Sequence, residues 1–378
     1  MSYIVQRKER FYVVAYDGLD PLSGKERRRW HPVGHDRDEA EAVRRRLELE
    51  PRDQQPATGG PITVSTFLHE TWMPRKRRQV RATTAYRYAW FIEHYITPAI
   101  GDIPLRRLRV DHLENLYQQL AVTGGRHHDG LAPKTILEVH MIVRAALGLA
   151  TERQLVVRNV ATSAQLKLPR AGGPIARSWT ASELASFLTR AHHHRLFPAL
   201  HLAAHTGMRR GEIVGLKWCD LDTAARRLSI RRTVQCVGGQ PVEFGVKTRT
   251  SRRTVELDPA TIDLLRRWRR RLQRDGLPNG IDDWMFCNPT GRYLNPQSLT
   301  PLFDRIVRIS DLPRIRFHDL RHTHASLLVA SGESIKVVSD RLGHAHPAFA
   351  IHTYQHLLFG MSAAAADRFA TMIATANR

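Results

Sequence analysis

Two stretches rich in proline and glycine divide the chain and argue against one continuous domain. They are Pro51–Pro61 and Pro169–Pro174, and each interrupts a pattern of regularly spaced apolar residues. Proline lacks a backbone N–H and glycine favours irregular backbone, so such stretches predict linkers. At about 100–200 residues per domain, a chain of this length holds two or three domains. We predict domains over residues 1–50, 62–168 and 179–378, with linkers at 51–61 and 169–178.

The first segment has the pattern of a small sheet followed by a helix. Apolar and polar residues alternate over residues 10–32 around a turn at Asp17–Gly24, and helical spacing follows from Asp36 to Leu49. This pattern predicts a ββα unit, or a βββα unit if a further strand joins the sheet. Residues 1–60 hold 12 basic and 11 acidic residues, so the segment is almost neutral.

The second segment is helical throughout. Its apolar residues predict breaks at Pro98, Pro104 and Gly124-Gly125, and helices near Val64–Trp72, Thr84–Tyr95, Val110–Leu120 and Pro133–Arg153. Basic residues cluster beside these helices, namely Arg75, Lys76, Arg77, Arg78, Arg106 and Arg107. Because clustered cations attract a phosphate backbone, we predict that these six residues bind DNA.

The third segment mixes helices and strands. Thr180–Glu183 and Asp258–Pro259 are typical helix starts. Runs rich in Val, Thr and Ile predict strands at Leu228–Val237 and Val242–Leu257. Further helices are predicted over residues 196–205, 260–274, 318–330, 335–342, 347–357 and 362–375. The whole chain is therefore predicted to be multidomain and mainly α, with small β-sheets.

Composition narrows the classes of function. The chain holds 58 Lys and Arg against 36 Asp and Glu, a net charge of +22, so nucleic acid is the first partner to consider. No run reaches the roughly 18 apolar residues of a membrane span, and the first ten residues lack the apolar core of a signal peptide. We therefore expect a soluble, cytoplasmic protein with no membrane partner.

Cysteine and histidine usage argues against a metal site. The three cysteines, Cys219, Cys236 and Cys287, form no C-x-x-C pair, and the run His192–His194 has no second ligand group at a familiar spacing. We therefore expect no bound metal.

Several short motifs of the third segment place polar residues that could perform chemistry. Arg209 follows the predicted helix end at Thr206-Gly207, and His318 and Arg321 are three apart, hence on one helix face. Along the chain these residues follow the order Arg209, Lys247, His318, Arg321, His344 and Tyr354.

In this order and spacing the motifs resemble the active site of the tyrosine recombinases, also called the phage integrase family. The resemblance covers about residues 175–378. The helical segment resembles the family's core-binding, SAM-like domain, and residues 1–50 look like the arm-binding domain of its larger integrases.

This resemblance implies a site-specific recombinase that cuts and rejoins DNA through a 3′-phosphotyrosyl intermediate, without metal or other cofactor. It implies integration or excision of a phage or other mobile element by a homotetramer on double-stranded attachment sites. Excisionase or DNA-bending proteins are the expected accessory partners, and the DNA-bound enzyme is expected at the nucleoid.

The transfer of the phosphoryl group explains the tyrosine and the two arginines. A tyrosine phenolate can store a broken phosphodiester as a covalent ester, which makes Tyr354 the candidate nucleophile. Two planar guanidiniums, Arg209 and Arg321, can hold the phosphoryl oxygens of the transition state.

Proton transfer explains Lys247 and His318. Arginine does not release a proton, so Lys247 is the candidate general acid for the departing 5′ oxygen. His318 can take up the tyrosine proton, because imidazole titrates near neutral pH. His344 is expected to hydrogen-bond a phosphate oxygen. Glu212, one helical turn from Arg209, is expected to orient the site or to form a structural salt bridge.

Three alternatives remain on the sequence alone. They are a chromosome-dimer-resolving recombinase, a type IB topoisomerase-like enzyme and a non-catalytic DNA-binding regulator. The segment over residues 1–50 and an Ala-rich helix at Ser362–Thr375, which could dock on a neighbouring subunit, favour recombination over a topoisomerase-like activity. The same N-terminal segment favours an integrase over a chromosome-dimer-resolving recombinase. A decayed regulator would have lost at least one motif residue, and none is missing.

Overall fold

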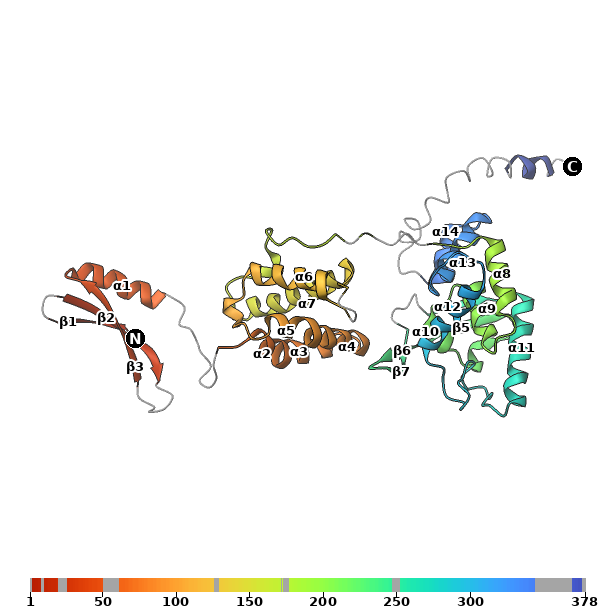
Figure 1. Ribbon diagram of the computed structural model, residues 1–378, viewed down its shortest axis with the longest axis horizontal. Coiled ribbons are helices and arrows are strands. Elements are labelled where there is room, and N and C mark those ends of the chain that lie inside the picture. The colour runs from red at the N-terminus through yellow and green to blue at the C-terminus, as the bar shows by residue number, and fades with distance from the viewer. Residues whose placement is uncertain are drawn as a thin grey trace. The chain divides into compact units, whose positions relative to one another are not determined.

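The computed structural model describes residues 2–7, 10–19, 26–49, 61–125, 129–170, 172, 177–246, 252–343 and 369–375 (Figure 1). The chain forms two units, Met1–Ile62 and Thr63–Arg378. The described residues are mainly helical, and their strands form small antiparallel sheets, which confirms the predicted fold class. None of the described helices combines the length and the apolar character needed to cross a membrane. The finer division at residues 169–178 stays a prediction.

The first unit is a three-stranded sheet with one helix. Its strands are β1 (Ser2–Arg7), β2 (Arg10–Leu19) and β3 (Glu26–Gly34), in that order, and α1 (Arg37–Leu49) packs on them. The optional third strand of the prediction is therefore present, as β1. Val13 and Val14 of the sheet and Ala40 of the helix are fully buried.

The second unit begins with helices at the four predicted positions, although the helix predicted to end at Trp72 continues to Gln79. They are α2 (Val64–Thr66), η1 (Phe67–Trp72), α3 (Met73–Gln79), α4 (Ala82–Phe91), η2 (Ile92–Ile96), α5 (Thr97–Ile100), η3 (Leu105–Arg107), α6 (Val110–Thr123), α7 (Pro133–Glu152) and η4 (Val160–Thr162). Large apolar side chains such as Phe67, Ile92 and Leu113 are fully buried among them.

The predicted helix break at Pro98 is wrong. The helix passes through this proline and ends at Ile100. The segment just before it, η2, is a π-helix, and the N–H of Thr97 bonds to the carbonyl of Ile92, five residues back. This change of hydrogen-bond register accommodates a residue that has no N–H to donate and whose ring would clash with a regular preceding turn.

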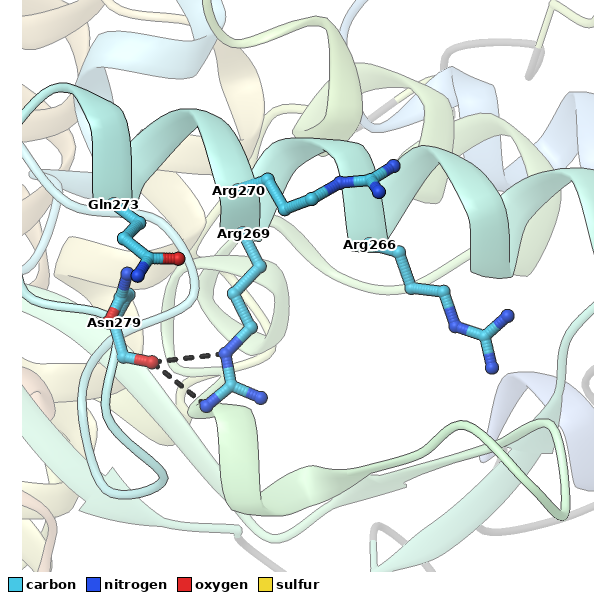
Figure 2. Close-up of a pocket in the computed structure, with 5 residues that line it drawn as sticks. All are labelled: Arg266, Arg269, Arg270, Gln273 and Asn279. Carbon is cyan, nitrogen blue, oxygen red and sulfur yellow. Dashed lines mark hydrogen bonds between the residues drawn. The ribbon is translucent and has the colours of Figure 1, made fainter.

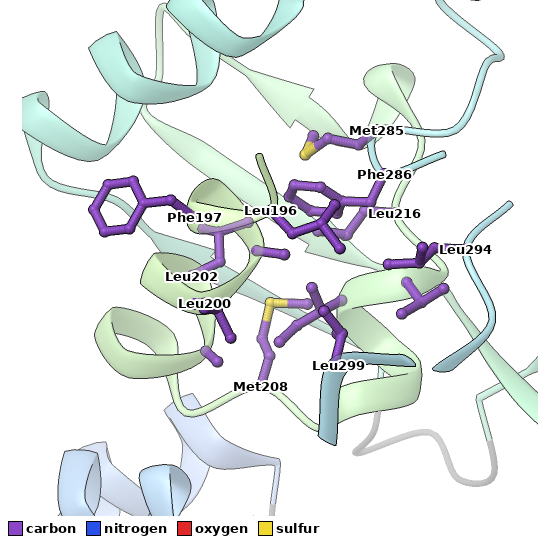
Figure 3. Close-up of a cluster of buried hydrophobic side chains, with 14 of the residues drawn as sticks. Leu196, Phe197, Leu200, Leu202, Met208, Leu216, Met285, Phe286, Leu294 and Leu299 are labelled. Atoms are coloured by element: carbon purple, nitrogen blue, oxygen red, sulfur yellow. The ribbon is translucent and has the colours of Figure 1, made fainter. Parts of the chain in front are cut away.

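The rest of the second unit holds a large apolar core and a second, smaller apolar cluster. Its elements are α8 (Ala181–Ala191), α9 (Phe197–Thr206), α10 (Arg210–Val214), η5 (Trp218–Asp220), β4 (Leu221–Asp222), β5 (Arg227–Ile230), β6 (Arg232–Val237), β7 (Gln240–Gly245), β8 (Arg253–Glu256), α11 (Pro259–Arg274), η7 (Pro296–Ser298), α12 (Leu299–Ile309), α13 (Asp319–Ala330) and α14 (Ile335–Leu342). Figure 3 shows part of the core, where Leu200, Met208 and Phe286 lie buried between these elements. The sequence did not predict α12 or β4.

Each of the two predicted strands divides into two. Leu228–Val237 becomes β5, in the sheet β4-β5-β8, and β6, in a separate hairpin with β7. Leu228 and Ile230 are buried in alternation, whereas the adjacent Thr233 and Val234 are both buried, so β6 is covered on both faces there. Arg232, at the start of β6, forms an ion pair with the buried Asp220 and fixes the change of direction.

Two predicted helices lie largely outside the described residues. The helix over 347–357 is wholly outside them, and of the one over 362–375 only residues 369–375 are described, as helix.

The start of α11 provides a test of local helix capping. Asp258 is the N-cap, and its carboxylate accepts a hydrogen bond from the backbone N–H of Thr261 at 2.9 Å. We expect Asp258→Ala to lower the free energy of unfolding of this unit by about 1 kcal/mol, because that N–H loses its acceptor. Urea titration measures the change. Asp263→Ala, an exposed position of the same helix, is the control and should stay within about 0.5 kcal/mol of the wild type. Equal losses in both variants would refute the capping role.

Candidate active site

Gly207 sets the position of Arg209. It ends α9 with a φ of +62°, and a Cβ built there would lie 2.5 Å from the side chain of Leu342, so both backbone conformation and space require glycine. Two residues later Arg209 takes extended backbone as the N-cap of α10. The predicted helix end at Thr206-Gly207 is confirmed.

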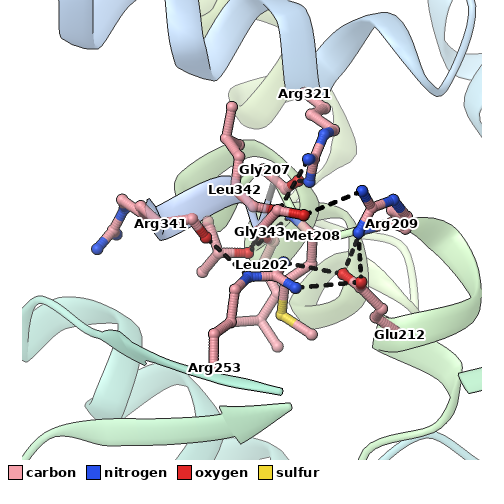
Figure 4. Close-up of polar contacts among 11 residues, drawn as sticks. Leu202, Gly207, Met208, Arg209, Glu212, Arg253, Arg321, Arg341, Leu342 and Gly343 are labelled. Carbon is pink, nitrogen blue, oxygen red and sulfur yellow. Dashed lines mark hydrogen bonds and ion pairs between the residues drawn. The ribbon is translucent and has the colours of Figure 1, made fainter. Parts of the chain in front are cut away.

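Glu212 is a buried carboxylate that holds two arginines (Figure 4). Its side chain is 4% exposed and accepts hydrogen bonds from the backbone N–H of Arg209 at 2.9 Å and from Nη1 of Arg209 at 2.8 Å. Both terminal nitrogens of Arg253 bind its two oxygens, at 3.1 and 2.9 Å. Burial acts to raise the pKa of Glu212, but Arg253 and Arg209 outweigh it and hold the pKa below its usual value. The carboxylate is therefore ionised and paired.

Three arginines converge on the C-terminal end of α14. Nε of Arg253 donates to the carbonyl of Arg341 at 2.8 Å, Nη2 of Arg321 to that of Leu342 at 2.7 Å, and Nη2 of Arg209 to that of Gly343 at 3.4 Å. The last carbonyls of a helix lack intrahelical partners and carry partial negative charge, so guanidiniums suit them. Figure 4 shows this convergence of side chains from separate elements on one helix end.

Arg321 is buried and doubly anchored. Besides the carbonyl of Leu342, its Nη1 donates to the carbonyl of Gly207 at 2.8 Å. Arg209, by contrast, leaves 41% of its side chain exposed. The two arginines that the sequence singled out as phosphate ligands therefore meet at the same helix end, one fixed inside the protein and the other partly open to solvent.

The helix α14 is itself held by a neutral histidine. Nε of Arg341 donates to Nε2 of His324 at 3.2 Å, and Nδ1 of the same ring lies 3.1 Å from the carbonyl of Ala204. Burial, together with Arg341, lowers the pKa of His324 to about 3. The ring therefore stays neutral at pH 7, accepting at Nε2 and donating at Nδ1.

His318 lies at the start of α13 and lines the same hollow as Arg209. Burial lowers the pKa of His318 to about 4, and the neighbouring His322 and Arg321 contribute to this shift. An imidazole that is neutral at pH 7 can accept a proton. The side chain is thus in the protonation state that the predicted role requires.

Lys247, His344 and Tyr354 lie outside the described residues. The described stretch 252–343 ends directly before His344, and the gap over 247–251 follows β7 and Val246. Their roles stay predictions.

The six predicted DNA-binding residues belong to two helical segments. Arg75, Lys76, Arg77 and Arg78 lie on α3, and Arg106 and Arg107 on η3. All are exposed except Lys76, which is half-buried with its Nζ 5.9 Å from the ring of Trp72. Their exposure permits contact with a phosphate backbone, and their role stays a prediction.

Arg253 is a part of the site that was not predicted from the sequence. Its side chain is 6% exposed, which is rare for an arginine, and it joins β8 to Glu212 and to α14. In the sequence it is one of several arginines after Lys247, and nothing local distinguishes it from the exposed Arg252. Within the described residues, no three His, Cys, Asp or Glu side chains gather as a metal site would require.

Two family models match the chain. One, described as the phage integrase family, matches residues 179–361, and the other, described as the phage integrase N-terminal SAM-like domain, matches residues 63–121. Similar proteins include a "Tyrosine recombinase XerC-like" of Caldanaerobacter subterraneus subsp. tengcongensis, 24% identical over 94% of this chain and 95% of that protein. The "ICEBs1 integrase" of Bacillus subtilis is 25% identical over 90% of this chain and 91% of that protein.

Solved structures share the fold. The Tn1549 transposon integrase in complex with a circular intermediate DNA has a TM-score of 0.66 and 18% identity, over 82% of this chain and 99% of that one. A lambda integrase tetramer bound to a Holliday junction has a TM-score of 0.57 and 17% identity, over 92% of this chain and 96% of that one. The chain belongs to the phage integrase family, the tyrosine recombinases.

Proposed function

We infer that the protein is a site-specific DNA recombinase that integrates or excises a mobile element. The observation that carries this inference is the meeting of Arg209 and Arg321 at adjacent carbonyls of α14, with the neutral His318 beside them. Two guanidiniums fixed in place before substrate binds are suited to a phosphoryl group whose charge grows in the transition state. Relatives described as integrases of a phage and of the elements ICEBs1 and Tn1549 support a mobile-element substrate.

In this mechanism the phenolate of Tyr354 attacks the scissile phosphate. A bond forms between phosphorus and the tyrosine oxygen, and the bond to the 5′ oxygen breaks, which leaves a 3′-phosphotyrosine and a free 5′ hydroxyl. His318 takes the tyrosine proton, and Lys247 supplies the proton of the departing 5′ oxygen. A 5′ hydroxyl of the partner strand then reverses these steps and rejoins the DNA.

The arginines and His344 carry the negative charge of the phosphate. An arginine has five N–H donors, so Arg321 can hold its two carbonyls and still donate to a phosphoryl oxygen. Arg209, half-exposed, completes the clamp, and His344 adds a hydrogen bond. Glu212 holds Arg209 in place without touching the substrate.

Double-stranded DNA is the proposed partner, bound by a homotetramer. The basic residues of α3 and η3, Arg75–Arg78 and Arg106–Arg107, are proposed to bind the DNA backbone. The lambda integrase tetramer on a Holliday junction supports this assembly, because the two chains share a fold. Excisionase and DNA-bending partners are expected on family grounds.

The first unit is proposed to bind arm sites that flank the core site. Arg28 and Trp30 lie two residues apart on β3 and so face the same side of the sheet, and both are exposed. Arg28 also contacts Tyr3, with Nη1 2.8 Å from the hydroxyl oxygen. A cation beside aromatic rings on a flat sheet is suited to DNA, although residues 1–60 are nearly neutral overall.

Loss of the nucleophile tests the recombinase assignment directly. We expect Tyr354→Phe to abolish the covalent protein–DNA complex and to change duplex affinity by only a few-fold, because one hydroxyl contributes little to binding. A suicide duplex, nicked beside the cleavage site of a candidate element junction, traps the complex on a denaturing gel. Tyr293→Phe is the matched control and should form the complex normally. Protein-linked DNA in the Tyr354→Phe variant would exclude this residue as nucleophile.

The position of Arg253 predicts a role in aligning the site. We expect Arg253→Met to slow single-turnover cleavage by about 10- to 100-fold, which corresponds to the 1.4–2.7 kcal/mol of a lost hydrogen bond to a charged group. DNA affinity should stay within a few-fold, because Arg253 is buried. Arg253→Lys should recover part of the rate.

The control is Arg252→Met, which removes an exposed neighbour and should cleave normally. Measurements well below the unfolding temperature separate alignment from stability, which the loss of a buried partner also lowers. Cleavage by Arg253→Met at the wild-type rate would show that Arg253 has no aligning role.

Deletion of residues 1–50 tests the arm-binding role. We expect the shortened protein to cleave a short core-site duplex normally and to lose recombination that depends on flanking arm sites. In the full-length chain, Arg28→Gln should lower arm-dependent recombination, whereas the exposed Arg45→Gln on α1 should not. Equal recombination by shortened and full-length proteins on arm-containing DNA, at matched salt, would rule out the role.

A further inference from the structure

The outer face of α11 is a concentrated positive surface that the proposed mechanism does not use. The helix carries six arginines and one aspartate, a net charge of +5 within Pro259–Arg274. Its apolar residues, including Leu265, Trp268 and Leu272, are buried against the core, so the arginines occupy the other side. Five of the six are exposed, namely Arg266, Arg267, Arg270, Arg271 and Arg274.

This concentration is not a general effect of the basic composition. The helix α8 carries one Glu and one Arg, and α12 carries one Asp and two Arg, for net charges of 0 and +1. Both helices pack on the same core as α11. Among the described residues, two exposed aspartates form long ion pairs with the α11 arginines. They are Asp263, 3.5 Å from Arg266, and Asp275, 3.7 Å from Arg271.

A hollow beside the helix is lined by hydrogen-bond donors and no carboxylate. It has a volume of about 470 Å³ and is lined by Arg266, Arg269, Arg270, Gln273 and Asn279 (Figure 2). Arg269 forms its fixed wall, since its Nε and Nη2 donate to the carbonyl of Asn279 at 3.0 and 2.9 Å and its guanidinium stacks over Trp218. Arg266 and Arg270 extend from the helix beside it, as Figure 2 shows.

The spacing of these two arginines suits a phosphate backbone. Positions i and i+4 of a helix lie about 6 Å apart along its axis, close to the length of two nucleotide steps at about 3.4 Å each. Arginine rather than lysine also favours phosphate, because its planar fork donates two parallel hydrogen bonds.

The surface lies away from the candidate active site. In Figure 1, α11 runs along the edge of its part of the chain opposite to α10 and the β6–β7 hairpin. Arg209 caps α10, so a duplex held at Arg209 does not cover α11 by the same contacts.

We propose that the arginine face of α11 binds the phosphate backbone of duplex DNA outside the cleavage site. The proposal rests on the proposed function, since it adds a second DNA surface to a recombinase. Such a surface holds a second duplex, or the flank of a bent one, while the first is held for cleavage. The contact is independent of sequence, because it reads phosphates only.

The test asks whether protein already holding one duplex binds another through α11. Protein trapped covalently on a nicked cleavage-site duplex is titrated with a fluorescent duplex of unrelated sequence, about 30 base pairs or about 100 Å long. Binding is followed by anisotropy at several salt concentrations. The test variant is Arg266→Gln with Arg270→Gln. The matched control is Arg190→Gln with Arg305→Gln, which removes two exposed arginines from α8 and α12.

We expect the α11 variant to bind the second duplex more weakly, with a salt dependence shallower by about 1.8, or 0.9 for each lost phosphate contact. The control should match the wild type, and all three proteins should form the covalent complex equally. The first unit is present in each protein, so any DNA that it binds contributes equally. Equal salt slopes in the α11 variant and the wild type, or equal losses in variant and control, would overturn the proposal.

Two additional experiments cover the case of an unstable variant and the case in which no covalent complex forms. If the double variant unfolds at a lower temperature, Arg270→Gln alone is used, with half the expected change in slope. If wild-type protein forms no covalent complex, the proposed function fails, and the titration is repeated on protein saturated with an unlabelled short duplex. Weaker binding of the fluorescent duplex by the α11 variant in that titration would support the DNA surface on α11 without the recombinase function. Equal binding by variant and wild type would exclude the DNA surface as well as the function.

Discussion

The C-terminal end of α14 is the point on which the rest of the site depends. Three consecutive carbonyls, those of Arg341, Leu342 and Gly343, each accept a hydrogen bond from a different arginine. The donors come from the start of α10, the start of β8 and the interior of α13, which are up to 112 residues apart in sequence, from 209 to 321. One helix end therefore aligns three elements that no local sequence pattern brings together. Loss of that end would remove one hydrogen bond from each of the three arginines at once.

How much of this was predictable follows from how local each interaction is. The helix starts at Thr180 and Asp258 were predicted because each cap and its partner lie three residues apart. The split of the strand over 228–237 was not, since it depends on the ion pair of Arg232 with Asp220, outside the strand. The helix break predicted at Pro98 was wrong because the preceding π-helix, η2, allows this proline to lie within a helix. In each failure the deciding contact lay outside the pattern that was read.

The candidate site shows the same division. The motif order placed Arg209, Glu212, His318 and Arg321 in one site, and the structure brings these four residues together around α14 and the start of α13. Arg253 was missed, because its carboxylate partner lies 41 residues earlier and its burial has no signature in a run of arginines. The order of the motifs therefore indicated the residues expected to contact the phosphate. It did not indicate Arg253, the buried arginine that binds Glu212 and the end of α14.

The charge of this cluster links substrate to stability. The cluster at the end of α14 holds three arginines, Arg209, Arg253 and Arg321, and one ionised carboxylate, that of Glu212, so these four side chains together carry a net charge of +2. Like charges held close together repel, and the free protein bears that cost in its folded state. Under the proposed function, a phosphodiester of DNA supplies negative charge that reduces this repulsion. DNA bound in this way would act as a counterion for the cluster and would stabilise the native state by mass action, as any preferential ligand does.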